Sequence, residues 1–222
     1  MDFARLLDPV AASIVIGGTL GATALRSGFT ECAAALGALV HPRFREDRVR
    51  GALAPMVAQA EREGLLRTSL RPSGDASIDA ALGALIQTRS LAAFVSSDDA
   101  AREVRVAKAV GAVRTLALAA ELSPVFGLAG TLVSLSQLPT EGLARGAFMS
   151  AISMAVLTTL YGLLLGNLLL APLSRRVERQ VEAEEAARRE IADWLIAKLG
   201  PACPPAQSSS GAVRRAYLRE VP

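Results

Sequence analysis

The chain has 222 residues, of which 51% are hydrophobic and 4% aromatic, with a mean hydropathy of +0.36 and a formal net charge of +3. This aliphatic excess is high for a soluble helical domain, which interrupts its apolar runs with charge every few residues. The basic surplus comes without aromatic residues or a recognition helix beside it, which argues against nucleic-acid binding.

An apolar segment near the start predicts a transmembrane helix within residues 1–26. Ala22-Thr23-Ala24 has the small-x-small form of a signal-peptidase site, so a cleaved secretory signal is the competing interpretation. A signal begins with a basic region, whereas here Asp2 and Asp8 outnumber the single arginine, and Arg26 directly follows the apolar run. These charges favour a membrane helix, whose glycines allow close helix packing.

Residues 27–113 predict a helical cytoplasmic domain, because apolar positions recur at helical spacing and no strand pattern is present. Turns are expected at His41-Pro42, at Gly64 and at residues 71–75. The amphipathic run 56–66 predicts a helix closed by a glycine cap at Gly64. Ser97 is followed by two aspartates, so we expect a helix to start there and to continue into the next apolar run.

Residues 114–173 predict a transmembrane hairpin. Residues 116–138 carry one charge, Glu121, and residues 147–173 carry none. About 20 apolar residues suffice to cross the hydrocarbon core of a membrane, so each run can span it. The polar stretch 139–145 forms the hinge between them. The alternative is a buried central helix of a soluble bundle.

Residues 174–199 alternate acids and bases with apolar positions at helical spacing, which predicts a cytoplasmic extension of the last membrane helix. Residues 200–222 are rich in proline and serine and predict a flexible tail. The expected fold is therefore all-α. It is a polytopic membrane protein with three transmembrane helices, long helices that extend into the cytoplasm and a helical cytoplasmic domain.

The distribution of basic residues predicts the orientation of the three spans, because short cytoplasmic loops carry an excess of lysine and arginine. Basic clusters follow the first span, precede the second and follow the third, while the opposite side holds only the acidic N-terminus and the hinge. The N-terminus is therefore expected outside and the C-terminus inside. The clusters are Arg26, Arg43, Arg45, Arg48 and Arg50; Arg102, Arg105, Lys108 and Arg114; and Arg175, Arg176 and Arg179.

The sequence contains no combination of residues that indicates enzyme catalysis. Cys32 and Cys203 are far apart and both fall on the reducing side, so neither a disulfide nor a zinc site is expected. His41 is the only histidine, and it precedes a proline in a basic turn without a partner at suggestive spacing. We therefore predict no enzyme activity, no metal site and no cofactor.

Polar chemistry is concentrated inside the predicted hairpin. Helical spacing places Gly127, Thr131 and Ser134 on one face of the second span. The same spacing groups residues of the third span, namely Ala155, Thr159, Gly162 and Gly166. Simple helix packing explains such stripes equally well, since a threonine hydroxyl can bond to a carbonyl of its own helix. The functional interpretation is that Thr131 and Thr159, with Thr158 and Ser134 beside them, offer oxygens to a passing ion.

An ion path through lipid also needs a charged group near its middle, and the hairpin lacks one. Glu121 precedes Thr131 by ten residues, which is about 15 Å along a helix and places it near the inner interface. A buried membrane carboxylate is costly and is normally kept for function. If the chain conducts ions, the central carboxylate is therefore expected from another subunit.

Two blocks of the hairpin closely resemble the motif helices of the MotA/TolQ/ExbB proton channel family. They are residues 120–132 (AELSPVFGLAGTL) and 154–168 (MAVLTTLYGLLLGNL). Residues 171–173 (APL), 7–9 (LDP) and 14–23 (IVIGGTLGAT) resemble the MotA branch, the flagellar stator subunits. Together these stretches cover about a third of the chain.

The resemblance implies a homopentamer in the bacterial inner membrane around two copies of a single-span MotB, TolR or ExbD-like partner, which supplies the membrane aspartate that binds H⁺ or Na⁺. By motif position, Thr131 and Thr159 would line the ion route, and Pro124 and Pro172 would serve conformational coupling. The small residues expected to pack around the partner are Gly127, Gly130, Ala155, Gly162 and Gly166.

Other positions depart from the family patterns. The TolQ/ExbB branch carries a glutamate where this chain has Met154, which favours the MotA branch, yet three spans is the TolQ/ExbB count. The charged pair with which stators contact the rotor falls at Glu61 and Ser69, where a base and then an acid are expected. A shifted register would offer Glu61, Arg62 and Glu63 as the contact instead.

Three functions therefore stay open. The first is a stator-like subunit that uses proton or sodium flow to rotate its partner. The second is an energiser of envelope transport of the TolQ/ExbB type, and the third is a non-conducting membrane scaffold.

Overall fold

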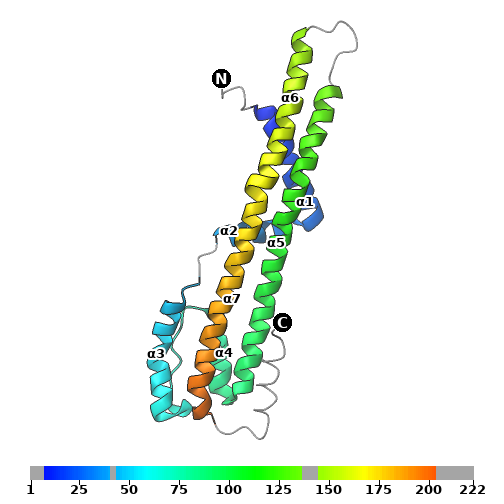
Figure 1. Cartoon of the computed structure of the whole chain (residues 1–222). Coiled ribbons are helices and arrows are strands. Elements are labelled where there is room, and N and C mark those ends of the chain that lie inside the picture. The colour runs from blue at the N-terminus through cyan, green and yellow to red at the C-terminus, as the bar shows by residue number, and fades with distance from the viewer. Residues whose placement is uncertain (1–7, 41–43, 137–144, 204–222) are drawn as a thin grey trace, which may run out of the picture. The chain divides into compact units, whose positions relative to one another are not determined.

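The computed structural model describes residues 8–40, 44–136 and 145–203. Within these ranges every regular element is a helix, as the all-α prediction requires. The elements are α1 (Pro9–Ser27), α2 (Phe29–Val40), α3 (Glu46–Glu63), η2 (Leu65–Arg67), α4 (Ala76–Thr88), α5 (Leu91–Ser136), α6 (Arg145–Leu163), the π-helical η3 (Leu164–Leu170), α7 (Ala171–Leu199) and η4 (Gly200–Ala202) (Figure 1). Residues 1–7, the His41 turn, hinge residues 139–144 and tail residues 204–222 lie outside the described residues.

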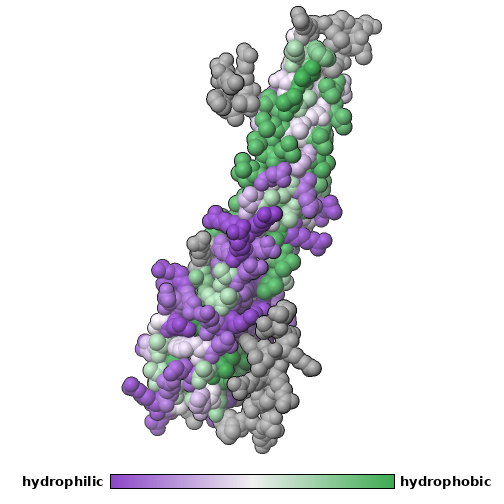
Figure 2. All heavy atoms as spheres, viewed as in Figure 1, coloured by the Kyte–Doolittle hydropathy of each residue, from purple (hydrophilic) through white to green (hydrophobic). Residues whose placement is uncertain are grey.

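Among the residues that the structure describes, three helices are long and apolar enough to cross a membrane, which agrees with the predicted number of spans. They are Pro9–Ser27, Leu91–Ser136 and the continuous helix Phe148–Ala202. Large apolar side chains of these helices stay on the surface, and Val125, Leu128 and Leu132 of α5 are each more than half exposed. Hydrophobic surface covers the α5–α6 hairpin on the face drawn in Figure 2. Such an extended patch is suited to lipid or to other membrane helices.

The chain forms two compact units. The first unit contains residues 1–41 and 107–181, and the second contains residues 42–106 and 182–222. The short helix α2 thus belongs with the membrane helices, although the sequence grouped it with the cytoplasmic segment 27–113. Ala35 of α2 packs against Ala112 and Leu116 of α5 and Val177 of α7.

The start of α1 is fixed by a side-chain cap. The carboxylate of Asp8 accepts hydrogen bonds from the backbone N–H groups of Val10 and Ala11, at 2.9 and 3.3 Å, and Pro9 occupies the first helical position. Such caps satisfy backbone donors that the first turn leaves without partners. The backbone N–H of Asp8 also donates to the hydroxyl of Tyr161 at 3.0 Å, which ties α1 to α6.

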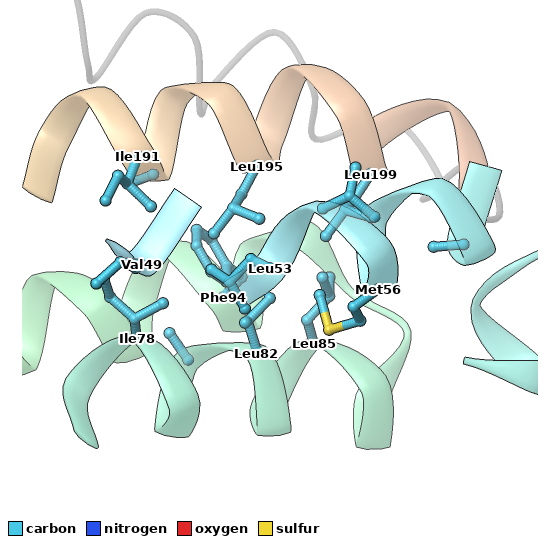
Figure 3. Packing of buried hydrophobic residues seen from close by; sticks show 14 of the residues in the cluster. Val49, Leu53, Met56, Ile78, Leu82, Leu85, Phe94, Ile191, Leu195 and Leu199 are labelled. Atoms are coloured by element: carbon cyan, nitrogen blue, oxygen red, sulfur yellow. The ribbon is translucent and has the colours of Figure 1, made fainter. Parts of the chain in front are cut away.

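The second unit has its own apolar core, made where α3, α4, the first turns of α5 and the last turns of α7 converge (Figure 3). Gly64 closes α3 at a φ of +80°, which bears out the predicted glycine cap. The core residues labelled in Figure 3 are Val49, Leu53, Met56, Ile78, Leu82, Leu85, Phe94, Ile191, Leu195 and Leu199.

One predicted helix boundary is wrong. α5 begins at Leu91, six residues before the expected start at Ser97. Phe94 is buried in the second core, and Leu91 and Val95 pack against it. Burial of these three apolar side chains extends the helix past the local capping signal at Ser97, because tertiary packing outweighs a cap worth about 1 kcal/mol.

Candidate functional site

Glycines bring the backbones of α5 and α6 into direct contact. A Cβ atom added to Gly162 would lie 2.7 Å from the carbonyl oxygen of Ser123 and 2.8 Å from the Cα of Gly127. A Cβ on Gly127 would lie 3.0 Å from the carbonyl oxygen of Thr158. Hence a Cβ at Gly162 does not fit while the helices keep this separation, and a Cβ at Gly127 fits only if the backbone of α6 gives way by a few tenths of an ångström. The predicted small-residue faces thus meet each other inside one subunit, and their packing around a partner stays a prediction.

Two of the four predicted ion-path hydroxyls are buried in this contact. Thr158 is fully buried with its side chain against Gly130, where an added Cβ would lie 2.8 Å from the Cβ of Thr158. Its hydroxyl donates to the carbonyl of Ala155 at 3.0 Å. The buried hydroxyl of Ser134 donates to the carbonyl of Gly130 at 2.8 Å. Both hydroxyls are therefore satisfied by their own helices within the hairpin.

The other two hydroxyls line a common groove. Thr131 and Thr159 are both half-buried, and they share an open groove of about 540 Å³ on the hairpin. The hydroxyl of Thr131 donates to the carbonyl of Leu128 at 2.6 Å, and that of Thr159 donates to the carbonyl of Ala155 at 3.2 Å. In these bonds the hydroxyl protons are used, so the oxygen lone pairs stay available to a cation or a water molecule. The other residues that line the groove are all aliphatic: Leu135, Ile152, Ala155, Val156, Leu160 and Leu163.

The two predicted coupling prolines lie next to an irregular part of the hairpin, the π-helix η3. Pro124 lies inside α5, and a Cβ on Gly166 of η3 would lie 3.1 Å from its Cδ and 2.7 Å from the carbonyl oxygen of Ala120. Proline has no N–H, so the carbonyl four residues earlier, that of Ala120, loses its helical donor. Pro172 is the second residue after η3. The π-helix, which no sequence pattern predicted, thus contacts Pro124 of the neighbouring helix at Gly166 and is followed by Pro172.

Sequence reasoning also missed two serines that link the hairpin helices. The buried hydroxyl of Ser123 donates to the carbonyl of Gly162 at 2.9 Å. The hydroxyl of Ser174 donates to the carbonyl of Val113 at 3.2 Å. Serine in an apolar helix usually bonds to its own backbone, so the sequence holds no signal that these two reach across.

The residues proposed for rotor contact lie at the end of α3 in the second unit. Glu61, Arg62 and Glu63 are all exposed, and the carboxylate of Glu61 forms an ion pair with Lys198 at 3.1 Å. Ser69, at the position where an acid was expected, is exposed as well. The structure thus leaves these charges available to a partner, and their role stays a prediction.

A half-buried charge network lies elsewhere in the second unit. Arg188 of α7 pairs with Asp75, the N-cap of α4, at 3.2 Å, and its guanidinium lies 4.4 Å from the ring centre of Phe44. Arg105 of α5 makes a two-pronged ion pair with Glu185 of α7, at 2.7 and 3.0 Å. These contacts join α4, α5 and α7 through side chains that are each less than a quarter exposed.

We expect the Asp75 carboxylate to make the stability of the second unit pH-dependent. Burial alone would raise the pKa of Asp75, but hydrogen bonds from Ser77 and the charge of Arg188 hold it below the ordinary value of 3.8. A lowered folded-state pKa contributes stability above the unfolded value, and this is lost as the pH falls through the folded pKa. Asp75→Asn, which keeps the capping oxygen, should therefore destabilise the unit near neutrality but not at strongly acidic pH.

The fluorescence of Trp194, the chain's single tryptophan, provides the measurement during denaturant unfolding. Asp75→Ala removes the cap as well, so it should cost about 1 kcal/mol more than Asp75→Asn at every pH. If the difference between wild type and Asp75→Asn were the same at acidic and neutral pH, the ion pair with Arg188 would not be its source.

Comparison with known proteins places the hairpin in a family. The model of the MotA/TolQ/ExbB proton channel family matches residues 79–190, half of the chain. Motility protein A of Borreliella burgdorferi is 38% identical over 68 residues, covering 31% of this chain and 26% of that protein. The chemotaxis protein PomA of Vibrio alginolyticus is 30% identical over 105 residues, covering 47% of this chain and 40% of that protein.

Solved structures agree on the fold. The flagellar MotAB stator complex of Bacillus subtilis contains a chain with a TM-score of 0.75 and 19% identity, matched over 99% of this chain and 91% of that one. The C. jejuni MotAB structure gives a TM-score of 0.70 and 16% identity, over 92% and 88% of the two chains.

These findings define an all-helical protein whose apolar helices are long enough to cross a membrane. The chain belongs to the MotA/TolQ/ExbB proton channel family, and its curated relatives are of the MotA branch. The matched region spans only about a quarter to two-fifths of the length of those relatives.

Proposed function

We propose that the chain is a stator-like subunit that lets protons or sodium ions flow along the α5–α6 hairpin and uses that flow to drive rotation of a partner. The observation that carries this proposal is the groove in which Thr131 and Thr159 lie together. Their oxygens are the polar ligands of a surface that is otherwise aliphatic, and family membership supports a role in ion passage.

The partner is a single-span subunit that carries a membrane aspartate. None of the eight residues that line the groove is charged, whereas ion passage through a membrane is normally associated with an ionisable group at depth. A partner helix seated on the groove would bring its carboxylate to the two threonine oxygens. The solved structures of similar fold, the flagellar MotAB stator complex of Bacillus subtilis and C. jejuni MotAB, support the presence of a second subunit.

The assembled complex is a homopentamer of this chain around two partner copies in the bacterial inner membrane. The N-terminus faces the periplasm and the C-terminus the cytoplasm, because basic residues cluster where the spans end on one side. An ion that crosses a potential of 100 mV releases about 2.3 kcal/mol per charge, which can bias one rotational step. The exposed charges of Glu61, Arg62 and Glu63 are the candidates for contact with a rotor.

Replacing Thr159 with valine tests the proposal, since the change removes one oxygen and keeps the branched shape. We expect ion flux into vesicles that hold the complex with its partner to fall about tenfold, which corresponds to losing one ion–oxygen interaction of about 1.4 kcal/mol. Thr159→Ser keeps the hydroxyl and should retain most of the flux.

Thr23→Val is the matched control. Thr23 is a buried threonine of α1 whose hydroxyl bonds to its own helix at 2.7 Å, and it does not line the groove. Wild-type flux in Thr159→Val, with normal assembly, would show that the hydroxyl is structural and would reject conduction past Thr159.

A non-conducting scaffold is the second candidate function. It is favoured by one observation: the hydroxyls of Thr131, Thr158, Thr159 and Ser134 all bond to carbonyls of their own helices. An energiser of envelope transport of the TolQ/ExbB type is the alternative use of ion flow. The domain type of the partner beyond its membrane span would distinguish a flagellar from an envelope pathway.

A further inference from the structure

Two serine bridges hold the hairpin helices on either side of the π-helix η3. The bridge from Ser123 to the carbonyl of Gly162 lies just before η3, and the bridge from Ser174 to the carbonyl of Val113 lies just after it. Each bridge joins a serine hydroxyl of one helix to a backbone carbonyl of the antiparallel helix. The distance along the helix axis between the serine Cα and the carbonyl-bearing residue is therefore the same at both bridges. It cancels when the two helix lengths between the bridges are compared.

The two helices have different numbers of residues between these bridges. From Val113 to Ser123, α5 advances by ten residues, whereas from Gly162 to Ser174 the chain advances by twelve. At the α-helical rise these stretches would span about 15 Å and about 18 Å. Both bridges could not form at once if residues 162–174 were entirely α-helical.

The π-helix removes this mismatch. Its hydrogen bonds run five residues back, as the bond from the N–H of Ala171 to the carbonyl of Gly166 does, so each turn contains more residues and advances less per residue. Pro172 favours this geometry because it lacks the N–H that would continue the α-helical ladder. Gly166 allows the wider turn to rest on the carbonyl of Ala120 and the ring of Pro124.

We propose that η3 is a register switch between the membrane hairpin and α7. When η3 changes from π to α geometry while the Ser123 bridge holds, the Ser174–Val113 bridge opens and α7 advances by about 3 Å, the rise of the two extra residues. The switch is therefore two-state, since the α form of η3 and the second bridge exclude each other.

The assignment of ion binding as the trigger rests on the proposed function. Thr159 lies one helical turn before Gly162, whose carbonyl accepts the Ser123 hydroxyl at the start of η3. A change in the hydrogen bond from Thr159 to Ala155, on ion entry, thus acts on the turn that adjoins the switch. Ser123 and Ser174 are positioning residues in this scheme, and neither touches the ion.

Spin labels on both sides of η3 measure the register directly. Ser153 and Arg179 are exposed, and neither lines the groove, so both can carry nitroxide labels in a background with Cys32→Ser and Cys203→Ser, in the full complex with its partner in lipid vesicles. We expect the label-to-label distance to lengthen by about 3 Å between alkaline and acidic buffer, or between choline and sodium salt. Ser174→Ala should shift the population to the longer distance without any change of buffer.

Ser136→Ala is the matched control, since the hydroxyl of Ser136 bonds to its own helix at 2.8 Å. It should leave the distance unchanged. A single distance that stays the same in every buffer and in Ser174→Ala would overturn the switch. A label-to-label distance that shifts with the buffer in a complex without measurable ion flux would support the switch and reject the proposed conduction.

A disulfide at the second bridge tests whether the switch is needed for ion flow. In the same background, Val113→Cys with Ser174→Cys should form a disulfide on oxidation, because these residues are neighbours. Ion flux should fall at least tenfold on oxidation and recover on reduction. Flux that is equal before and after oxidation, or a pair that cannot be oxidised, would overturn the proposal.

Discussion

Replacing Gly162 with alanine should unfold or separate the α5–α6 hairpin, at a cost of about 3 kcal/mol or more. Inserting even one methyl group into a well-packed contact typically costs about 1–3 kcal/mol when side chains can adjust. Here the new methyl would meet backbone atoms, the carbonyl oxygen of Ser123 at 2.7 Å and the Cα of Gly127 at 2.8 Å. Backbone cannot rotate away as a side chain can, so the helices themselves must separate.

The measurement is the thermal unfolding of the detergent-solubilised protein by circular dichroism, together with the recovery of the assembled complex. Gly21→Ala in α1 is the control, because a Cβ there meets nothing within 4 Å. Alanine stabilises an unobstructed helical position by about 0.5–1 kcal/mol relative to glycine, so the two substitutions should have opposite signs. Equal stability of Gly162→Ala and wild type would show that the helices are farther apart than this structure has them.

The Gly162 contact also shows how far sequence periodicity could predict the site. Positions three and four residues apart both lie near one face of a helix, on opposite sides of its centre line. The sequence therefore could not decide whether Gly130 or Thr131 joins Gly127 in the contact. The structure decides for Gly130, because the side chain of Thr158 occupies the space that any Cβ there would need. Because Gly130 faces the contact, the neighbouring Thr131 points to the side and lines the groove.

Thr158 and Thr159 illustrate the same limit on the other helix. Neighbouring residues point about 100° apart, so one threonine faces α5 and the other faces the groove. The sequence placed Thr159 on the packing face with Gly162, whereas Thr158 is the fully buried one. Only the identity of the opposing residue, a glycine at 130, fixes which of the two enters the contact.

Long-range features were the least predictable. The three spans follow from apolar length alone, and the cap at Gly64 follows from a local glycine. The π-helix depends instead on the spacing between two bridges that are far apart in the chain, so no local pattern reveals it. The start of α5 was misplaced because Phe94 joins a core whose other buried members come from α3, η2, α4 and α7.

A substitution in the apolar core of the second unit is the second with a large expected effect on stability. Leu82→Ala should lower the free energy of unfolding of the second unit by about 3 kcal/mol, within the range of 2–5 kcal/mol found for buried leucines. Leu82 of α4 is completely buried in the cluster of Figure 3, to which α3, α5 and α7 also contribute side chains. Truncation removes apolar contacts on several sides and leaves a cavity that rigid helices fill only in part.

Trp194 packs against this core and lies beneath the guanidinium of Arg50, 5.6 Å from the ring centre. Its fluorescence therefore follows unfolding of the second unit without a contribution from another tryptophan. Leu70→Ala is the control, since Leu70 is 45% exposed and its truncation should cost well under 1 kcal/mol. A loss below about 1 kcal/mol in Leu82→Ala would mean that the helices collapse into the cavity. The second unit would then be a loosely packed bundle, too soft to hold Glu61 and its neighbours in a fixed position against a partner.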